Sequence, residues 1–127
     1  MFNIEFYETP TGKSDMLDFL NVLFKKARVE KDARIQYSQV VRHIQLLQYN
    51  GTNLPVTITK HLLDNIWELR PGKNRIFYFF EDDENTYVLL HHFVKKTRKT
   101  PKTELDRAIK ERDDYLSRKE CDDNELG

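Results

Sequence analysis

The chain has 127 residues, a length that fits one ordinary domain built around a single hydrophobic core. Its 21 lysines and arginines balance its 21 aspartates and glutamates, so net charge excludes any general argument for nucleic-acid binding and leaves only local clusters. A single cysteine excludes an intramolecular disulfide and a cysteine-type metal cluster, which fits a reducing cytoplasm.

The N-terminal half predicts one strand and a pair of helices. Residues 2–7 alternate apolar and polar, as in a half-buried strand, and this order is not that of a secretion signal. Apolar residues at helical spacing follow Ser14, which is the expected N-cap of a first helix. The same spacing over residues 33–47 predicts a second helix that ends at Gly51. We expect these helices to form a hairpin.

The C-terminal half predicts three strands joined by tight turns and one more helix. The strands are expected at residues 65–70, 75–80 and 86–94. Thr100 is the expected N-cap of the last helix, with Pro101 in its first position. We expect that helix to close the domain near residue 118 and residues 119–127 to form an acidic, flexible tail.

The order of elements, β-α-α-β-β-β-α, predicts an α+β domain over residues 1–118 with an antiparallel sheet, an N-terminal helical hairpin and a C-terminal helix. Residues 51–64 are expected to be a loop. We expect the helices to cover one face of the sheet and to leave the other open. The longest apolar runs fall well short of the roughly 20 residues that cross a bilayer, so we expect no membrane attachment.

Charged residues are expected to gather on the open face. Alternation places Glu68 and Arg70 on the side opposite Trp67, and Arg75 begins the next strand. Neighbouring antiparallel strands would bring these groups into one patch. In the alternative interpretation, Glu68 and Arg70 form an ordinary surface ion pair that contributes little.

A basic segment precedes the last helix. Its cations are Lys95, Lys96, Arg98, Lys99 and Lys102. Free backbone N–H groups and the helix dipole also favour anions at such a position, so the segment is suited to hold a phosphate. The alternative is a solvated surface loop in which Thr100 already occupies some of the N–H groups.

Other chemistries lack their usual motifs in this sequence. It contains no glycine-rich phosphate loop, no Gly-x-Ser-x-Gly turn and no helical pair of histidines spaced to bind a metal. We therefore expect neither a metal nor a cofactor.

The charged motifs resemble, in their order, those of the HigB-like branch of the RelE/ParE toxin superfamily. They are Trp67–Arg70, Arg75–Tyr78, Leu89–Phe93, Lys95–Lys96 and Lys99–Pro101. The preceding helical hairpin agrees with this resemblance, which extends to about residue 118. The combination of motifs is specific, although each of them alone is weak.

The resemblance implies the toxin of a type II toxin–antitoxin system, a metal-independent endoribonuclease that cleaves messenger RNA, commonly on the ribosome. It also implies a HigA-like antitoxin with a helix-turn-helix domain, through which the toxin would contact operator DNA indirectly. In such enzymes the 2′-hydroxyl of the RNA is the nucleophile, so the protein needs only a base, an acid and cations. Two alternatives are a non-catalytic RNA- or protein-binding module and a ParE-like toxin directed at DNA gyrase.

Catalytic roles carried over from the resemblance fall on four charged residues. Glu68 is the expected general base and Arg75 the expected clamp on the scissile phosphate. Arg70 would orient Glu68 or the RNA backbone, and Lys96 would stabilise charge in the transition state.

One of two adjacent histidines is expected to protonate the leaving oxygen, since histidine titrates near neutral pH. Alternation allows only one of His91 and His92 to face the site, and His92 is the catalytic candidate. The expected RNA contacts are Lys95, Arg98, Lys99, Lys102 and Tyr78. Several relatives carry a tyrosine near the end of the chain that this sequence lacks, which leaves Tyr78 or Phe77 as substitutes for base stacking.

Overall fold

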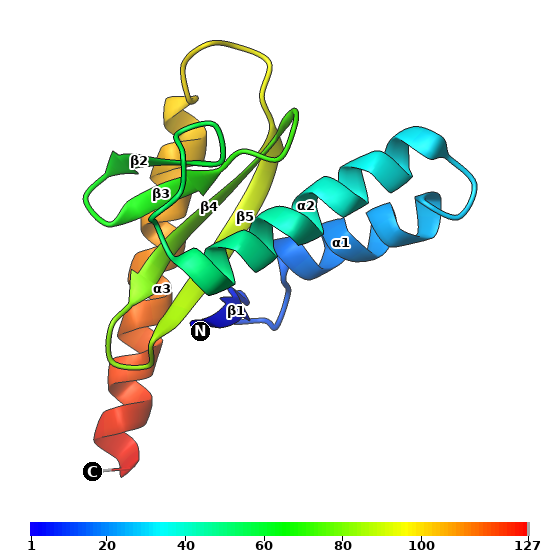
Figure 1. Ribbon diagram of the computed structural model, residues 1–127. Coiled ribbons are helices and arrows are strands. Elements are labelled where there is room, and N and C mark those ends of the chain that lie inside the picture. The colour runs from blue at the N-terminus through cyan, green and yellow to red at the C-terminus, as the bar shows by residue number, and fades with distance from the viewer. Residues whose placement is uncertain (127) are drawn as a thin grey trace.

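The computed structural model describes the backbone of residues 1–126 and the side chains of residues 1–122. Its elements are β1 (Asn3–Phe6), α1 (Asp15–Lys26), α2 (Lys31–Asn50), β2 (Thr59–Leu63), β3 (Ile66–Leu69), β4 (Asn74–Glu81), β5 (Thr86–Val94) and α3 (Lys102–Leu126). The α1–α2 hairpin projects sideways from a twisted sheet, and α3 runs along the sheet behind it (Figure 1). The predicted α+β class, with its helical hairpin and C-terminal helix, is confirmed.

The sheet is mixed rather than wholly antiparallel. Its strand order is β1-β5-β4-β3-β2, and β1 pairs in parallel with β5 while the other pairs are antiparallel. The prediction was wrong for β1 because no tight turn links it to β5, so turn geometry does not set its direction.

The structure adds a strand, β2, within the segment predicted to be a loop. Its five residues lack clear alternation, and its pairing with β3 shifts register between His61 and Leu63. The strand is fixed by tertiary contacts, since the buried Thr59 hydroxyl donates to the Glu68 carbonyl oxygen at 2.7 Å. A short edge strand of this kind leaves little trace in the sequence pattern.

Helices cover both faces of the sheet, which corrects the prediction that one face is open. On one face the α1–α2 hairpin packs Met16, Val40 and Leu47 with Ile76 and Leu89 of the sheet. On the other face, α3 packs Ala108, Leu105 and Ile109 with Phe77, Phe79, Val88 and Leu90. Strands β4 and β5 are apolar on both sides, a pattern typical of a sheet buried between two layers.

The last helix is longer than the sequence analysis predicted. It continues through Leu126, and the Lys119 ammonium lies 2.6 Å from the Glu81 carboxylate, so the chain shows no break at residue 118. Of the predicted tail, Gly127 and the side chains of residues 123–127 lie outside the described residues. Within the described part of the chain, no helix is both long and apolar enough to cross a membrane.

Both predicted caps of the helical hairpin are confirmed. The Ser14 hydroxyl accepts a hydrogen bond from the Leu17 N–H at the start of α1. Gly51 follows the last residue of α2 at φ +60° and ψ −143°, and its N–H donates to the Leu47 carbonyl oxygen. This backbone conformation is essentially restricted to glycine.

We expect Gly51→Ala to destabilise the fold by about 1–3 kcal/mol, because an added Cβ is strained there. That Cβ would also lie 2.8 Å from the Tyr87 hydroxyl and 3.1 Å from the Phe2 ring. The matched control is Gly12→Ala, since Gly12 also has positive φ but no atom within 4 Å of the added Cβ. Urea denaturation should show the larger loss for Gly51→Ala, and equal losses would contradict this packing.

Candidate active site

The candidate site lies on the α3 face of the sheet. Its polar residues belong to two rows of paired residues that are neighbours on this face. Glu68 of β3 pairs with Phe77 of β4, which pairs in turn with His91 of β5. In the next row Arg75 pairs with Phe93. Because side chains alternate along a strand, the first row and Arg75 share the face that α3 covers.

The carboxylate of Glu68 is the centre of a compact polar cluster. Its Oε2 atom lies 3.8 Å from Arg70 Nε and 3.9 Å from Arg75 Nε. Its Oε1 atom accepts a hydrogen bond of 3.4 Å from the Thr100 hydroxyl. The Glu68 side chain is only 2 % exposed, so these neighbours rather than water surround its carboxylate. We call Glu68, Arg70, Arg75 and Thr100 the Glu68 cluster.

The Arg75 guanidinium forms hydrogen bonds through one terminal nitrogen but not through its Nε. One terminal nitrogen donates to the carbonyl oxygens of Gly72 and Asn74, at 2.7 and 2.8 Å. Its Nε is buried and has no hydrogen-bond partner among the described residues. Burial lowers the pKa of Arg75, the Glu68 charge opposes this, and Arg70 adds to it, but a guanidinium remains charged at any physiological pH.

An unsatisfied buried donor costs about 1–3 kcal/mol, and such groups call for a specific explanation. A phosphate oxygen would supply the missing acceptor for Arg75 and match the planar fork of its guanidinium. The Glu68 cluster is therefore suited to bind an anion next to a carboxylate.

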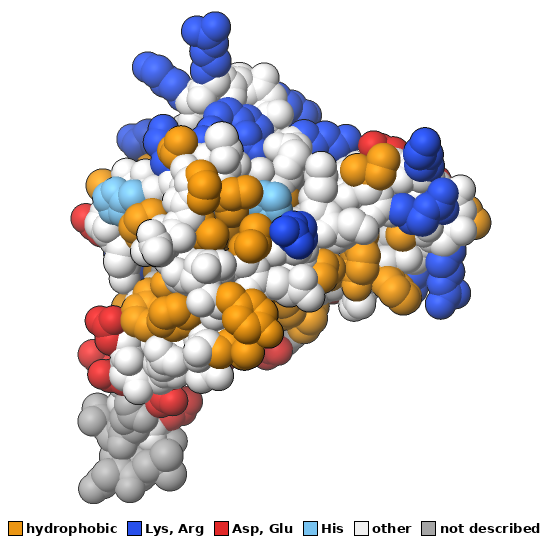
Figure 2. All heavy atoms as spheres, in the orientation of Figure 1, with side chains coloured by type: hydrophobic (Ala, Val, Ile, Leu, Met, Phe, Trp, Pro, Cys, Tyr) orange, Lys and Arg blue, Asp and Glu red, His pale blue; other side chains and the backbone are white. Residues whose placement is uncertain are grey.

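The basic segment arches over the end of the sheet between β5 and α3 (Figure 1). Lys and Arg side chains gather over this end of the molecule, whereas acidic groups gather near the lower part of α3 (Figure 2). Lys96, Arg98, Lys99 and Lys102 are exposed, and Lys95 is half-buried. None of the five forms an ion pair with a side chain that the structure describes. These charges are free to meet an anionic ligand.

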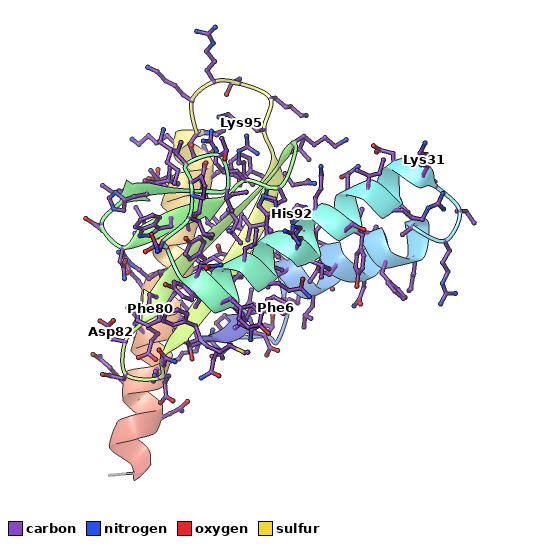
Figure 3. The ribbon with its side chains drawn as sticks, in the orientation of Figure 1. Phe6, Lys31, Phe80, Asp82, His92 and Lys95 are labelled. Carbon is purple, nitrogen blue, oxygen red and sulfur yellow. The ribbon has the colours of Figure 1, made fainter. Side chains whose placement is uncertain are left out.

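The structure does not bring His92, the catalytic histidine candidate, to the Glu68 cluster. His92 lies on the opposite face, beside α1, where its ring stacks on Phe19 at 3.8 Å. Its Nδ1 and its backbone N–H both bond to the Asp15 carboxylate, at 2.6 and 3.0 Å. Figure 3 shows His92 beside the α1–α2 hairpin.

A β-bulge at Leu90 explains this difference. Tyr78 pairs with Leu89 and Phe77 pairs with His91, so Leu90 is an extra residue in β5. Simple alternation from Leu90 would turn His92 toward α3, but the bulge turns His91 there instead. His91 is therefore the histidine that shares a face with Glu68.

His91 is fully buried and both of its ring nitrogens are engaged. Its Nδ1 bonds to Glu111 and its Nε2 to Glu104, at 2.9 Å for Glu104. Both ring nitrogens are therefore occupied by carboxylates of α3. His91 thus ties α3 to the sheet and has no free nitrogen to offer a substrate.

Neither aromatic candidate for base stacking is accessible. Tyr78 and Phe77 are both fully buried, on opposite faces of the sheet. The Tyr78 hydroxyl bonds to the Thr59 hydroxyl at 2.7 Å, and burial raises the pKa of Tyr78. The proposed RNA contact by Tyr78 is therefore wrong for this structure.

Sequence reasoning missed the partners that complete these arrangements. Asp15 is the partner of His92, Glu104 and Glu111 hold His91, and Thr100 contacts Glu68 from the other end of the chain. Only Thr100 had a local signal, and that signal predicted a helix cap. Among the side chains that the structure describes, no group of three or more His, Cys, Asp and Glu is arranged to hold a metal ion.

Comparison with solved structures defines the class of fold. The chain is similar to RelE in the archaeal RelE-RelB complex from Pyrococcus horikoshii OT3, with a TM-score of 0.51 and 12% identity over 77% of this chain and 98% of that one. The toxin-antitoxin complex RelBE2 from Mycobacterium tuberculosis matches at a TM-score of 0.37 and 17% identity, over 74% and 98% of the two chains. The match to the Pyrococcus horikoshii chain shows that the fold is RelE-like.

The sequence itself identifies the family. Residues 28–113 match the family described as "Phage derived protein Gp49-like (DUF891)", and the chain belongs to that family. A comparison with curated proteins finds no match. The sequence thus assigns the chain to the Gp49-like family, and the structure shows that its fold is RelE-like.

The Asp15–His92 contact predicts a pH-dependent contribution to stability. Burial alone would raise the pKa of Asp15, but hydrogen bonds from the His92 ring and backbone and the charges of His92 and Arg107 lower it to about 2. Since the folded-state pKa lies below the ordinary value of 3.8, this stabilisation is complete above about pH 4 and is lost as pH falls toward 2.

We expect Asp15→Asn to cost about 1–2 kcal/mol at pH 7 and to flatten the stability profile between pH 4 and 2. Asp18→Asn is the matched control, because Asp18 lies in the same first turn of α1 but is exposed. Thermal unfolding across this pH range provides the measurement. An unchanged profile in Asp15→Asn would show that the contact does not stabilise the fold.

Proposed function

We propose that this protein is the toxin of a toxin–antitoxin system and acts as a metal-independent endoribonuclease on messenger RNA in the cytoplasm, in association with the ribosome. The observation that carries the proposal is the buried Glu68 carboxylate between Arg70 and Arg75, beside an exposed basic segment with unpaired cations. A base and a phosphate clamp are the groups that cleavage by the 2′-hydroxyl of RNA requires.

Each group has one role in the proposed reaction. Glu68 takes the proton of the 2′-hydroxyl, whose oxygen then forms a bond to the adjacent phosphorus. The bond between that phosphorus and the 5′-oxygen of the next nucleotide breaks. The products are a 2′,3′-cyclic phosphate and a 5′-hydroxyl, and the 5′-oxygen takes its proton from solvent. The protein supplies no nucleophile and needs no metal for this step.

The cations act on the phosphate. Arg75 would hold the scissile phosphate through its guanidinium, and Arg70 would keep the Glu68 carboxylate oriented. Lys96 would stabilise charge on the phosphate oxygens. The remaining cations of the basic segment, Lys95, Arg98, Lys99 and Lys102, would contact neighbouring phosphates. His92 has no part in this scheme, because it lies on the other face of the sheet.

A partner protein is also proposed. The Pyrococcus horikoshii relative was solved as a complex of RelE with RelB, and we propose that an antitoxin with a helix-turn-helix domain binds this chain in a comparable way. Exposed apolar side chains on the α1–α2 hairpin support this, among them Val22, Phe24, Val29 and Ile35. Contact with operator DNA would then be indirect, through the antitoxin.

We expect Glu68→Gln and Arg75→Lys to lower the rate of RNA cleavage by about a hundred- to a thousandfold, because each removes a group aligned with developing charge. Cleavage is measured on naked RNA in EDTA and in a purified translation reaction. Arg112→Lys is the matched control, since Arg112 is as buried as Arg75, with 14 % against 12 % of the side chain exposed, but lies outside the Glu68 cluster.

Loss of activity in the two site variants, with retention in Arg112→Lys and unchanged melting temperatures, supports the enzyme. Wild-type protein that binds RNA without cleaving it in either assay would instead indicate a binding module. Growth arrest with gyrase-dependent DNA damage and intact messages would indicate a ParE-like target.

We expect the antitoxin, taken as the protein encoded beside this one, to protect either the α1–α2 hairpin or the basic segment from hydrogen exchange. Both surfaces carry groups that are left without a partner within the described chain. Residues of α3 that face solvent serve as the internal control. Protection of neither surface in a stable complex would contradict the proposed mode of binding.

A further inference from the structure

Thr100 makes a contact that its position in the sequence does not predict. It lies two residues before α3, one residue outside the N-cap position, so the prediction of Thr100 as the cap and Pro101 as the first helical residue is wrong. Here the N–H groups of Glu104 and Leu105 donate to the Pro101 carbonyl oxygen, and the Thr100 hydroxyl donates to Glu68 instead. The contact joins the basic segment to strand β3.

The two oxygens of Glu68 have different neighbours because of this contact. Both guanidinium Nε atoms approach Oε2, whereas the Thr100 hydroxyl approaches Oε1. Because Oε2 faces the two guanidinium groups, Oε1 is the oxygen left to take a proton from a substrate. Thr100 therefore lies on the reactive side of the carboxylate.

We propose that Thr100 is a positioning residue for Glu68, an inference that rests on the proposed nuclease function. In the free protein its hydroxyl holds Oε1 of the Glu68 side chain, which is 2 % exposed, in a fixed direction. A carboxylate oxygen can accept more than one hydrogen bond, so the 2′-hydroxyl can also bond to Oε1 while Thr100 keeps its contact.

A hydroxyl is well suited to this role because it both donates and accepts hydrogen bonds. It donates to Glu68 while the carboxylate is ionised and can accept from the carboxylic acid after proton transfer. Valine has nearly the shape of threonine but can do neither, whereas serine retains both abilities.

The test compares Thr100→Val with Thr100→Ser. We expect Thr100→Val to lower kcat about ten- to a hundredfold, the value of a hydrogen bond to a charged group, and to leave KM within about twofold. Thr100→Ser should restore most of the wild-type kcat. The matched control is Thr97→Val, because the exposed Thr97 hydroxyl in the same segment donates only to the Lys99 carbonyl oxygen at 2.9 Å.

Wild-type kcat in Thr100→Val, or equal losses in the valine and serine variants, would overturn the proposal. A readout independent of activity separates this result from a failure of the proposed function. The ¹³C signal of the Glu68 side-chain carboxyl, assigned by its absence in Glu68→Gln, should move in Thr100→Val and not in Thr97→Val. If the signal does not move, the contact between Thr100 and Glu68 is wrong, whether or not the wild-type protein cleaves RNA. If the signal moves while the wild-type protein cleaves no RNA, the contact is supported and only the nuclease function fails.

Discussion

The structure depends on one electrostatic arrangement, a buried carboxylate held between two guanidinium groups at the end of the sheet. Removing Glu68 from water is costly unless positive charge and hydrogen bonds replace the lost hydration. Arg70, Arg75 and Thr100 supply that replacement, each from a different part of the chain. Neither Nε lies within hydrogen-bond distance of Glu68, so the carboxylate does not use all the donors of the cluster. The fold thus maintains a charged site that is not fully satisfied by the protein alone.

The helices on the two faces of the sheet explain how a small protein holds the residues of such a site in place. On the α3 face, His91 binds Glu104 and Glu111 and fixes α3 above the strand that adjoins Arg75. On the other face, Asp15 bonds to the N–H and ring of His92 at a part of β5 that lies beyond its pairing with β1. The two adjacent histidines therefore anchor helices on opposite faces of the sheet. Because both histidines hold helices in place, Glu68 and solvent carry out the proton transfers in the proposed reaction.

Much of this organisation could be predicted from the sequence, but only where local pattern governs it. The caps at Ser14 and Gly51 and the side of the sheet taken by Glu68 follow from backbone preference and alternation. The bulge at Leu90 could not be predicted, because an extra residue changes the phase of alternation without a signature of its own, and it exchanged the roles expected for the two histidines. Strand β2, the parallel direction of β1 and the contact of Thr100 with Glu68 likewise depend on partners distant in the sequence. The helix layer on the second face, in contrast, could have been predicted from the sequence, since the residues of strands β4 and β5 are apolar on both sides of the sheet.

The central claim is that the Glu68 cluster and the basic segment hold one phosphodiester of RNA. The most direct test is a crystal structure of the wild-type protein with a short RNA that carries a 2′-deoxy nucleotide at the scissile position, which binds but cannot react. The expected result is a phosphate oxygen within hydrogen-bond distance of the Arg75 guanidinium and the 2′ carbon of the modified nucleotide beside Glu68 Oε1. RNA bound on the α1–α2 hairpin, or along the basic segment with Arg75 still unpaired, would contradict it.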